Sequence, residues 1–268
     1  MRVIAVFNHK GGVGKTTSVA NLGAALALQG RRVLLVDADP QACLSVHLGH
    51  DLADTGESLY EILTRGQPLA GAVRETEQEG LSLVPSHLDL AGVELELASA
   101  IGREQILRQA VDAYLADCRG LEYIIIDCPP SLGLLTVNSL CAAREVFVPL
   151  QTDYFALRGM SRLLEVVSLV KRRMNPGLRI TGILPTLHRR GTLLAREVKE
   201  EIEKHFGSIV FKTVIRANVR LAEAPSHGKT IFSYAPSSPG AEDYVAFAAE
   251  VGAMRGAPLP PETAPGIA

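Results

Sequence analysis

Tryptophan is absent from this 268-residue chain, and aromatic residues together make up only 5% of it. The core must therefore be built mainly from Leu, Val, Ile and Ala, within a hydrophobic share of 47% that is ordinary for a globular protein. No apolar run approaches the roughly 20 residues that a membrane-spanning helix needs. The opening MRVIAVF stops at Asn8, which is too short for a signal peptide. A cytoplasmic protein is expected.

Cysteine is also scarce. Neither a CxxC pair nor a metal-type spacing with histidine occurs among the four cysteines, which are Cys43, Cys118, Cys128 and Cys141. This pattern argues against a zinc site or an iron–sulfur cluster, and buried, reduced thiols are expected.

The chain has little net charge, −2, and so gives no global reason to expect nucleic acid or anionic lipid as a partner. The distribution is uneven. Residues 158–229 carry 15 Lys and Arg against 6 Asp and Glu, a net of +9, which leaves −11 for the rest. A surface for a polyanion and a set of solvated helix faces explain this asymmetry equally well.

Short β-branched runs alternate with helical patterns along the chain. The runs lack strict polar–apolar alternation, as expected for strands covered on both faces, and lie at 3–7, 33–36, 123–127, 145–150 and 179–184. Apolar residues at helical spacing predict helices at 15–29, 101–117, 156–173 and 192–206. This order predicts an α/β fold, a doubly wound, mostly parallel sheet flanked by helices.

Two stretches do not follow this order. Residues 50–100 have weaker periodicity and several turn residues, so we expect an insertion over an edge of the sheet. The last stretch, GAPLPPETAPGIA (256–268), is rich in Pro and Ala and is expected to be a disordered tail. The sequence therefore predicts one domain over residues 1–255, followed by this tail.

The stretch FNHKGGVGKTTS (7–18) lies between a predicted strand and a predicted helix, the context that a phosphate-binding loop requires. Its glycines allow backbone N–H groups to turn inward around a β-phosphate, at the positive end of the helix. Lys15 is expected to reach the β- and γ-phosphate oxygens, and Thr16 to join a Mg²⁺ shell. The loop residues expected to bind the nucleotide are Gly11, Gly12, Val13, Gly14, Lys15, Thr16 and Thr17.

The loop departs from the pattern GxxxxGK[ST], because His9 takes the place of its first glycine and Lys10 follows. A second lysine beside a phosphate that Lys15 already contacts is repelled unless a strong anion lies between them, and a triphosphate supplies that anion. Lys10 on the outer rim of the loop can instead face solvent or a neighbouring molecule.

The segments KGGVGKTT (10–17) and VDADPQ (36–41) resemble the deviant Walker A class of P-loop ATPases, the ParA/MinD family. The resemblance extends to about residue 254. In that family the first lysine crosses a nucleotide-sandwich dimer and touches the partner subunit's phosphates. The resemblance therefore implies that Lys10 acts across a homodimer and Lys15 within its own subunit, as an arginine finger does for charge on a transferred phosphoryl group.

Acidic residues follow two of the predicted strands. Asp37 and Asp39 lie at the edge of the sheet where ligands bind in such folds. One residue apart on an extended chain, they point in opposite directions, so they should not share one role. The resemblance assigns Asp39 to the attacking water and Asp37 to the surroundings of Mg²⁺. YIIIDCPPS (123–131) resembles a Walker B strand in which Asp127 holds Mg²⁺ through water; Asp127 as a strand-end cap is the alternative.

Later segments resemble the chromosomal ParA (Soj-type) branch, namely PLQTDYFALRGM (149–160) and NVRLAEAPSHGK (218–229). MinD proteins end in a basic amphipathic helix on the membrane, which the tail of this chain lacks. Long plasmid ParA proteins carry a helix-turn-helix domain before this point, and we expect none before residue 1 here. The expectation is a short DNA-segregation ATPase, with Asn218 in the loop that meets adenine in relatives; a turn or cap role is the alternative for Asn218.

Short ParA proteins bind DNA non-specifically through basic residues late in the chain. Arg220 matches one such position, although a helix-surface pairing with Glu223 explains it as well. Gly191 takes the place of a second family arginine, and Arg189 and Arg190 just upstream are candidates to replace it. The family's PRN is also changed here, to Arg-Ala-Asn at 216–218. Such binding would be directed at phosphates and sensitive to salt.

The sequence thus predicts a weak ATPase that uses ATP and Mg²⁺, forms an ATP-dependent sandwich dimer on nucleoid DNA and is stimulated by a ParB-type centromere-binding protein. A MinD-like ATPase on a membrane surface is the alternative, which liposome co-sedimentation would detect. An electron-donating ATPase like the nitrogenase iron protein needs two cluster cysteines per subunit; Cys128 directly after Asp127 is poorly placed for that. A small-molecule kinase would need an acceptor pocket, which no motif indicates.

Overall fold

A computed structural model describes residues 1–51, 56–152, 156–189 and 193–254. Within these residues, seven strands form one sheet in the order β3-β4-β2-β5-β1-β6-β7. All neighbouring pairs are parallel except β3 and β4. The strands are β1 (Arg2–Val6), β2 (Val33–Asp37), β3 (Arg74–Glu75), β4 (Leu81–Val84), β5 (Tyr123–Asp127), β6 (Glu145–Gln151) and β7 (Arg179–Thr186). The predicted doubly wound, mostly parallel sheet is confirmed.

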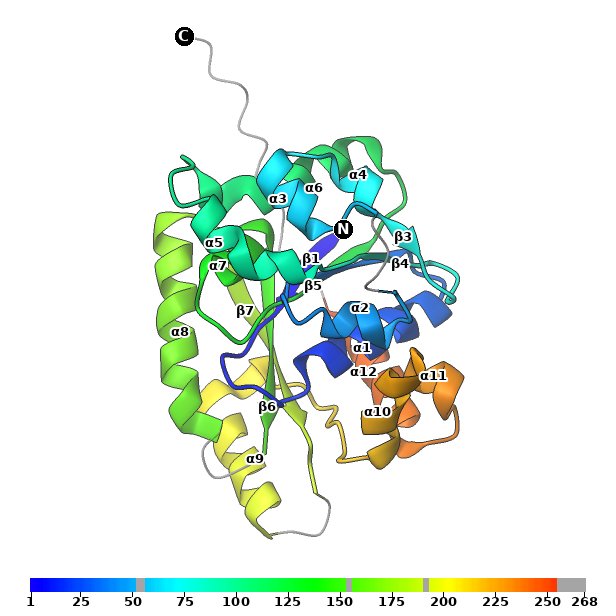
Figure 1. Cartoon of the computed structure of the whole chain (residues 1–268). Coiled ribbons are helices and arrows are strands. Elements are labelled where there is room, and N and C mark those ends of the chain that lie inside the picture. Colours follow the sequence, from blue (N-terminus) through cyan, green and yellow to red (C-terminus); the bar gives the residue numbers. More distant parts are fainter. Residues whose placement is uncertain (52–55, 153–155, 190–192, 255–268) are drawn as a thin grey trace.

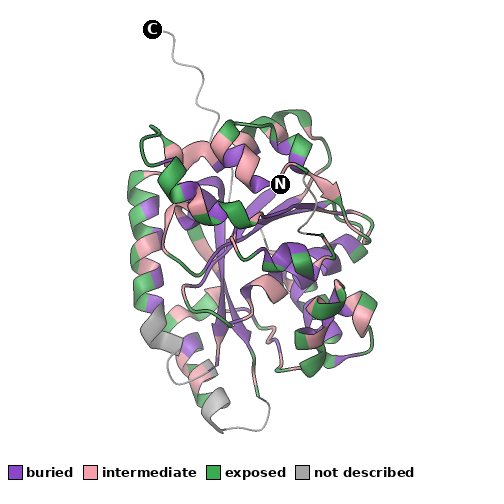
Figure 2. Cartoon of the chain, viewed as in Figure 1, coloured by how far each residue is buried: buried purple, intermediate pink, exposed green. Residues whose placement is uncertain are grey.

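Helices cover both faces of this sheet (Figure 1). One face carries α1 (Lys15–Leu28), α2 (Cys43–His47), α10 (Val219–Glu223), α11 (Ile231–Tyr234) and α12 (Pro239–Ala253). The other carries α3 (Leu59–Arg65), α4 (Leu69–Ala72), α5 (Val93–Glu96), α6 (Ile106–Asp117), α7 (Leu134–Ala142), α8 (Ala156–Arg173) and α9 (Leu193–Phe206). Each face encloses its own aliphatic core, and β1, β2 and β5 are buried throughout (Figure 2).

The structure differs from the expectation for residues 50–100. This region adds β4 to the sheet as a parallel neighbour of β2, and β3 pairs with β4 at the edge. The interpretation as an insertion over the sheet edge was therefore wrong for these strands, which are part of the sheet. The sequence shows little sign of β4, because LSLV is only four residues long and includes a polar Ser82. The predicted tail at 256–268 lies outside the described residues.

The cysteines have mixed environments. Cys128 and Cys141 are buried as expected, whereas Cys43 is exposed at the start of α2. No group of three or more His, Cys, Asp or Glu side chains suited to a metal gathers in the described part of the chain. None of the helices in these residues is both long enough and apolar enough to span a bilayer.

A buried ion pair joins β1 to the neighbouring strand β6. Arg2 donates from Nε and Nη2 to the two carboxylate oxygens of Glu145, over 2.8 and 2.7 Å. Its Nη1 donates to the Val251 carbonyl of α12 at 2.6 Å, and the Thr181 hydroxyl donates to Glu145 at 2.9 Å. The pair therefore ties β1, β6, β7 and α12 together.

Gly182 in β7 leaves space for an aromatic cluster. A Cβ atom there would overlap the Phe211 ring, which packs edge-on against Phe147 and Phe247 with centroids 5.0 and 4.8 Å apart. We expect Gly182→Val to lower the free energy of unfolding by about 1–3 kcal/mol, because the site is already filled. Urea denaturation measures this. Gly252→Ala, where nothing lies within 4 Å of the added carbon, is the matched control, and an equal effect of the two changes would contradict the packing argument.

Candidate active site

The predicted phosphate loop connects β1 to α1 at the carboxyl edge of the sheet (Figure 1). Gly12 and Gly14 adopt left-handed backbone conformations, with φ of 73° and 86°, which favour glycine. Nothing lies within 4 Å of a Cβ built at Gly11, Gly12 or Gly14. The glycines therefore enclose open space rather than protein atoms, as a loop that surrounds a ligand requires.

Lys15 begins α1 and is 7% exposed. Its Nζ donates to the Lys10 carbonyl at 3.2 Å, and so spans the loop. Burial lowers the pKa of Lys15, and the nearby carboxyl group of Asp127 acts in the opposite direction. The loop is also fixed from outside, because the Thr186 hydroxyl at the end of β7 donates to the Val13 carbonyl at 2.8 Å. Lys10 itself is exposed on the rim.

Asp127 ends β5 and is completely buried. Neither of its carboxylate oxygens forms a close hydrogen bond among the described residues, although the Thr16 hydroxyl and the Lys15 ammonium lie near enough to favour its ionised form. Burial nevertheless raises the pKa of Asp127 well above its usual range, and the neighbouring Asp37 carboxyl raises it further. A buried carboxyl group with so little compensation is costly, and this one indicates a place for a cation.

The residues present fit Mg²⁺ bound together with a nucleotide. Such an ion is commonly held by one or two protein oxygens, with water and phosphate oxygens completing its shell, so a cluster of carboxylates is not needed. Thr16 and Asp127 would supply the protein oxygens that hold the ion. The charge of the ion would stabilise the ionised form of Asp127, opposite to the effect of burial.

Asp37 and Asp39 have different environments, as their alternation predicts. Asp37 is buried, and its Oδ2 accepts hydrogen bonds from the Ser45 backbone N–H and hydroxyl, at 2.8 and 2.7 Å. Its Oδ1 accepts from the Asp39 backbone N–H at 3.2 Å. Burial raises the pKa of Asp37 to about 6. Asp39 is partly exposed, and its carboxylate accepts from the Gln41 backbone at 3.0 Å. Both oxygens of Asp37 are thus occupied by the chain itself.

A cavity of about 460 Å³ opens beside the loop. Loop residues and Asp39 line one part of it, and residues from α2, α10 and α12 line another, including His47, Asn218, Leu221 and Tyr244. Asn218 caps α10, because its Oδ1 accepts from the Arg220 backbone at 2.9 Å, while its buried Nδ2 has no partner among the described residues. The cap interpretation of Asn218 is therefore correct, and whether Asn218 also contacts a nucleotide stays a prediction.

Of the predicted DNA contacts, Arg189 and Arg220 do not line this cavity. Arg220 is exposed and donates to Glu223 at 2.8 Å, so the surface pairing exists. Arg189 is exposed beyond the end of β7, and Arg190 lies outside the described residues, as does Gly191. The arginine of the altered Arg-Ala-Asn segment is bound by Asp243 and Glu242.

Sequence reasoning missed several residues of the site, namely Ser45, His47, Thr186 and Tyr244. Thr186 has a sequence signal, a polar residue at the carboxyl end of a buried strand. The others reach the site through contacts between segments far apart in the chain, which no local pattern indicates.

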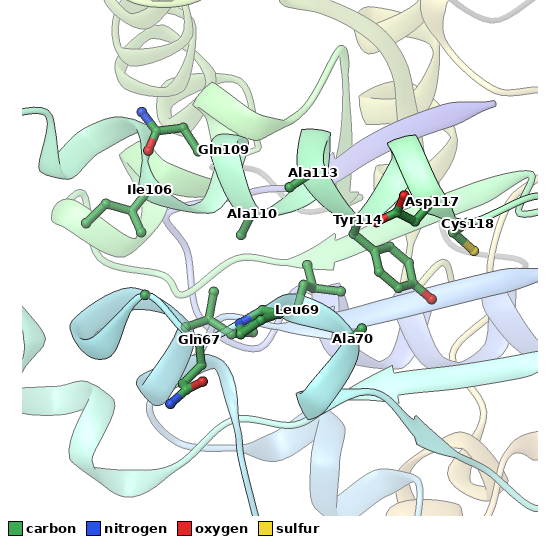
Figure 3. Close-up of a pocket in the computed structure, with 13 residues that line it drawn as sticks. Gln67, Leu69, Ala70, Ile106, Gln109, Ala110, Ala113, Tyr114, Asp117 and Cys118 are labelled. Atoms are coloured by element: carbon green, nitrogen blue, oxygen red, sulfur yellow. The ribbon is translucent and has the colours of Figure 1, made fainter.

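A second cavity, of about 600 Å³, lies between α3, α4 and α6 (Figure 3). Its walls are mostly aliphatic, with Leu69, Ile106 and Ala110 facing the space and Tyr114 at one end. The phosphate loop contributes nothing to it, so the smaller cavity is the candidate active site.

Comparisons with known proteins agree with this geometry. Residues 1–180 match the family described as an AAA domain. The chain is 48% identical over 252 residues to the sporulation initiation inhibitor protein Soj of Bacillus subtilis, covering 94% of this chain and 98% of the relative. It is 44% identical to the chromosome partitioning protein ParA of Caulobacter vibrioides, covering 94% of each.

Solved structures are similar over the same length. A Mycobacterium smegmatis protein with a bound ATP analogue and magnesium, described as a cobyrinic acid a,c-diamide synthase, superposes with a TM-score of 0.80 at 40% identity, covering 93% of each chain. The cell division ATPase MinD of Pyrococcus furiosus superposes with a TM-score of 0.77 at 27% identity, covering 94% of this chain and 98% of MinD. By sequence, fold and phosphate loop, the chain belongs to the ParA/Soj family of P-loop ATPases, which hydrolyse ATP with Mg²⁺.

Proposed function

We propose that this ATPase partitions DNA as an ATP-dependent sandwich dimer, which binds DNA without sequence preference and is released when a ParB-type protein stimulates hydrolysis. One observation carries the proposal. Lys15 lies near the buried Asp127 and near Asp39 at one edge of the sheet, while a second lysine, Lys10, is exposed on the rim of the same loop. Two relatives that cover 94% of the chain, from Caulobacter vibrioides and Thermus thermophilus, bear chromosome partitioning names, which favours this activity over a diamide synthase.

The proposed chemistry is the in-line attack of water on the γ-phosphate. Asp39 would orient the water, since its carboxylate is the partly exposed one of the pair. Lys15 would stabilise charge on the phosphate oxygens from within the subunit, and Lys10 would do so from its partner. When bound, Mg²⁺ would supply further neutralisation of the phosphate charge, and Thr16 and Asp127 would be the residues that hold it. Asp37 would act indirectly, by holding the loop that carries Asp39.

The dimer is tested with Asp39→Ala, which should bind ATP without hydrolysing it and so accumulate as a dimer. Size-exclusion chromatography with light scattering, in Mg²⁺ with ATP or ADP, measures the mass. A doubled mass with ATP and a single mass with ADP are expected. A single mass at saturating ATP contradicts the proposal.

The DNA-binding part rests on exposed cations late in the chain. Arg220 and Arg189 are exposed, and the segment around them carries the +9 net charge. The partner Glu223 is 40% exposed, and exposed ion pairs are worth only about 0–1 kcal/mol. A DNA phosphate can therefore compete with Glu223 for Arg220. Binding of this kind weakens steeply as salt rises.

We expect Arg220→Glu to weaken binding of the ATP-loaded dimer to random-sequence duplex DNA by about tenfold or more at moderate salt, because charge reversal removes one phosphate contact and adds repulsion. Fluorescence anisotropy over a salt series measures the affinity and its slope. Arg162→Glu is the matched control, since Arg162 also forms an exposed i,i+3 pair, with Glu165 on α8. Equal affinity of the Arg220 variant and wild type would count against a DNA role for α10.

A further inference from the structure

Ser86 is a buried residue, 2% exposed, that lies two positions beyond the end of β4. Strand β4 runs parallel to β2, with Val84 beside Val36, so the residues that follow the two strands are neighbours. The Ser86 hydroxyl donates to the backbone carbonyl of Asp39 at 2.7 Å. The roles proposed above for hydrolysis do not use this serine.

A closed ring of four hydrogen bonds contains this contact. The Ser86 N–H donates to the Ser45 hydroxyl oxygen at 3.0 Å, and the Ser45 hydroxyl donates to Asp37 Oδ2 at 2.7 Å. The Asp39 N–H donates to Asp37 Oδ1 at 3.2 Å. The Ser86 hydroxyl closes the circuit at the Asp39 carbonyl, and we call these four residues the serine–aspartate ring.

The ring contacts Asp39 on both sides of its Cα, through the N–H and through the C=O. Because peptide groups are planar, holding both of them fixes the direction in which the Cα–Cβ bond points. The Asp39 side chain is partly exposed and lines the nucleotide cavity. The ring therefore controls where this carboxylate lies, although none of the four bonds is made to it.

The contact from Ser86 differs from the local contacts of the turn. The Asp39 carbonyl also accepts from the Ala42 N–H at 2.9 Å, but this bond lies within the turn and moves with it. Ser86 anchors the turn to another strand. Asp37, Ser45 and Ser86 are all buried, where a hydrogen bond is strong and a broken one is costly. A displacement of Asp39 is therefore opposed by the whole ring.

We propose that Ser86 is a positioning residue for ATP hydrolysis. With Ser45 and Asp37 it holds the Asp39 backbone as one unit, so that the carboxylate stays directed at the attacking water. Ser86 does not line the nucleotide cavity, so it acts only through Asp39. The inference rests on the proposed function through the role of Asp39, and not through the dimer or DNA.

The first test is Ser86→Ala, which removes the hydroxyl and retains the N–H bond to Ser45. We expect kcat for Mg-ATP hydrolysis by the full chain to fall about tenfold, because a small misplacement of a reacting group slows the attack. The KM for ATP and the ADP affinity should stay within about twofold, because the phosphate loop is unchanged. Phosphate release and isothermal titration measure these values. Ser82→Ala, which removes a β4 hydroxyl that contacts Glu75 at an exposed position, is the matched control and should leave them unchanged.

The second test asks whether the ring acts as one unit. Ser45→Ala breaks two of the four bonds and should lower kcat at least as much as Ser86→Ala. The double variant should be no more than about twofold slower than the slower single variant, because one broken bond already opens the ring. Single-variant losses that multiply in the double variant would contradict the proposal, as would a normal kcat for Ser86→Ala or equal falls in kcat and ADP affinity. Should Ser86→Ala fail to fold, a normal kcat for Ser45→Ala overturns the proposal in the same way.

Asp39→Ala separates failure of this inference from failure of the proposed function. If Asp39→Ala loses hydrolysis while Ser86→Ala keeps it, only the positioning role is refuted. Normal hydrolysis by Asp39→Ala would refute the proposed chemistry, and the positioning role with it. A single mass for Asp39→Ala with ATP would contradict the dimer and leave these comparisons of rate unaffected.

Discussion

Lys10→Ala is expected to leave this ATPase monomeric at saturating Mg-ATP and to lower its stimulated hydrolysis by about a thousandfold, the lower range for a cationic finger supplied across an interface. The reason is the geometry of the loop. Lys15 is buried and reaches back across the loop to the Lys10 carbonyl, whereas the Lys10 side chain is exposed on the rim. We therefore expect Lys15 to contact the phosphates of its own subunit and Lys10 to contact those of a neighbouring subunit.

Three measurements check this expectation. Light scattering gives the mass with ATP, a phosphate-release assay gives turnover with and without partner and DNA, and titration gives the ADP affinity, which should stay within about twofold because Lys15 is intact. Lys171→Ala, on the exposed last turn of α8, is the control. A Lys10 variant with the mass of a dimer and normal turnover would contradict a role for this lysine across the interface.

Arg2→Ala is expected to lower the free energy of unfolding by about 3–5 kcal/mol, because it leaves the buried Glu145 carboxylate without its charged partner. Glu145 is 1% exposed and, among the described residues, would retain only the Thr181 hydroxyl as a hydrogen-bond donor. The change also removes the donor to the Val251 carbonyl. For a chain of this size each kcal/mol shifts the melting temperature by roughly 2–4 °C, so a loss of about 10 °C is expected in calorimetry.

Two further variants isolate the burial effect. Arg31→Ala breaks a pair with Glu122 of equal length, 2.8 Å, but both partners are exposed, so less than about 1 kcal/mol is expected. The double change Arg2→Met with Glu145→Leu should recover most of the loss, since an apolar pair often replaces a buried ion pair without penalty. A large effect of Arg31→Ala, or a double variant as unstable as Arg2→Ala, would contradict this account.

Much of the fold was predictable because the central strands are short apolar runs buried on both faces. β1, β2, β5 and β6 begin and end within a residue of the predicted runs, and β7 runs two residues longer, to Thr186. Their signal is local. β4 was missed because four residues with a polar one among them carry too little pattern. α7 was missed because buried residues surround most of its circumference, which removes the apolar stripe that identifies a surface helix.

The residues of the site likewise divide into those with a local sequence signal and those without one. The phosphate loop, Asp39 and Asp127 were found because their signal is a few adjacent residues at a strand end, and the i,i+3 spacing of Arg220 and Glu223 indicated their pairing. Contacts between separate segments occupy an oxygen of Asp37 and join Thr186 to the phosphate loop, and residue order alone does not encode them. The roles of these residues in hydrolysis and on DNA stay predictions.

The segment from Asp37 to His47 has a mechanical consequence. Asp37 holds Ser45 and the Asp39 backbone, while Ser86 braces both, donating from its hydroxyl to the Asp39 carbonyl and from its N–H to Ser45. Ala42 between them adopts a left-handed conformation, with φ of 51°. We therefore expect the Asp39 backbone to shift little when a nucleotide binds, because any displacement would break hydrogen bonds to both Asp37 and Ser86.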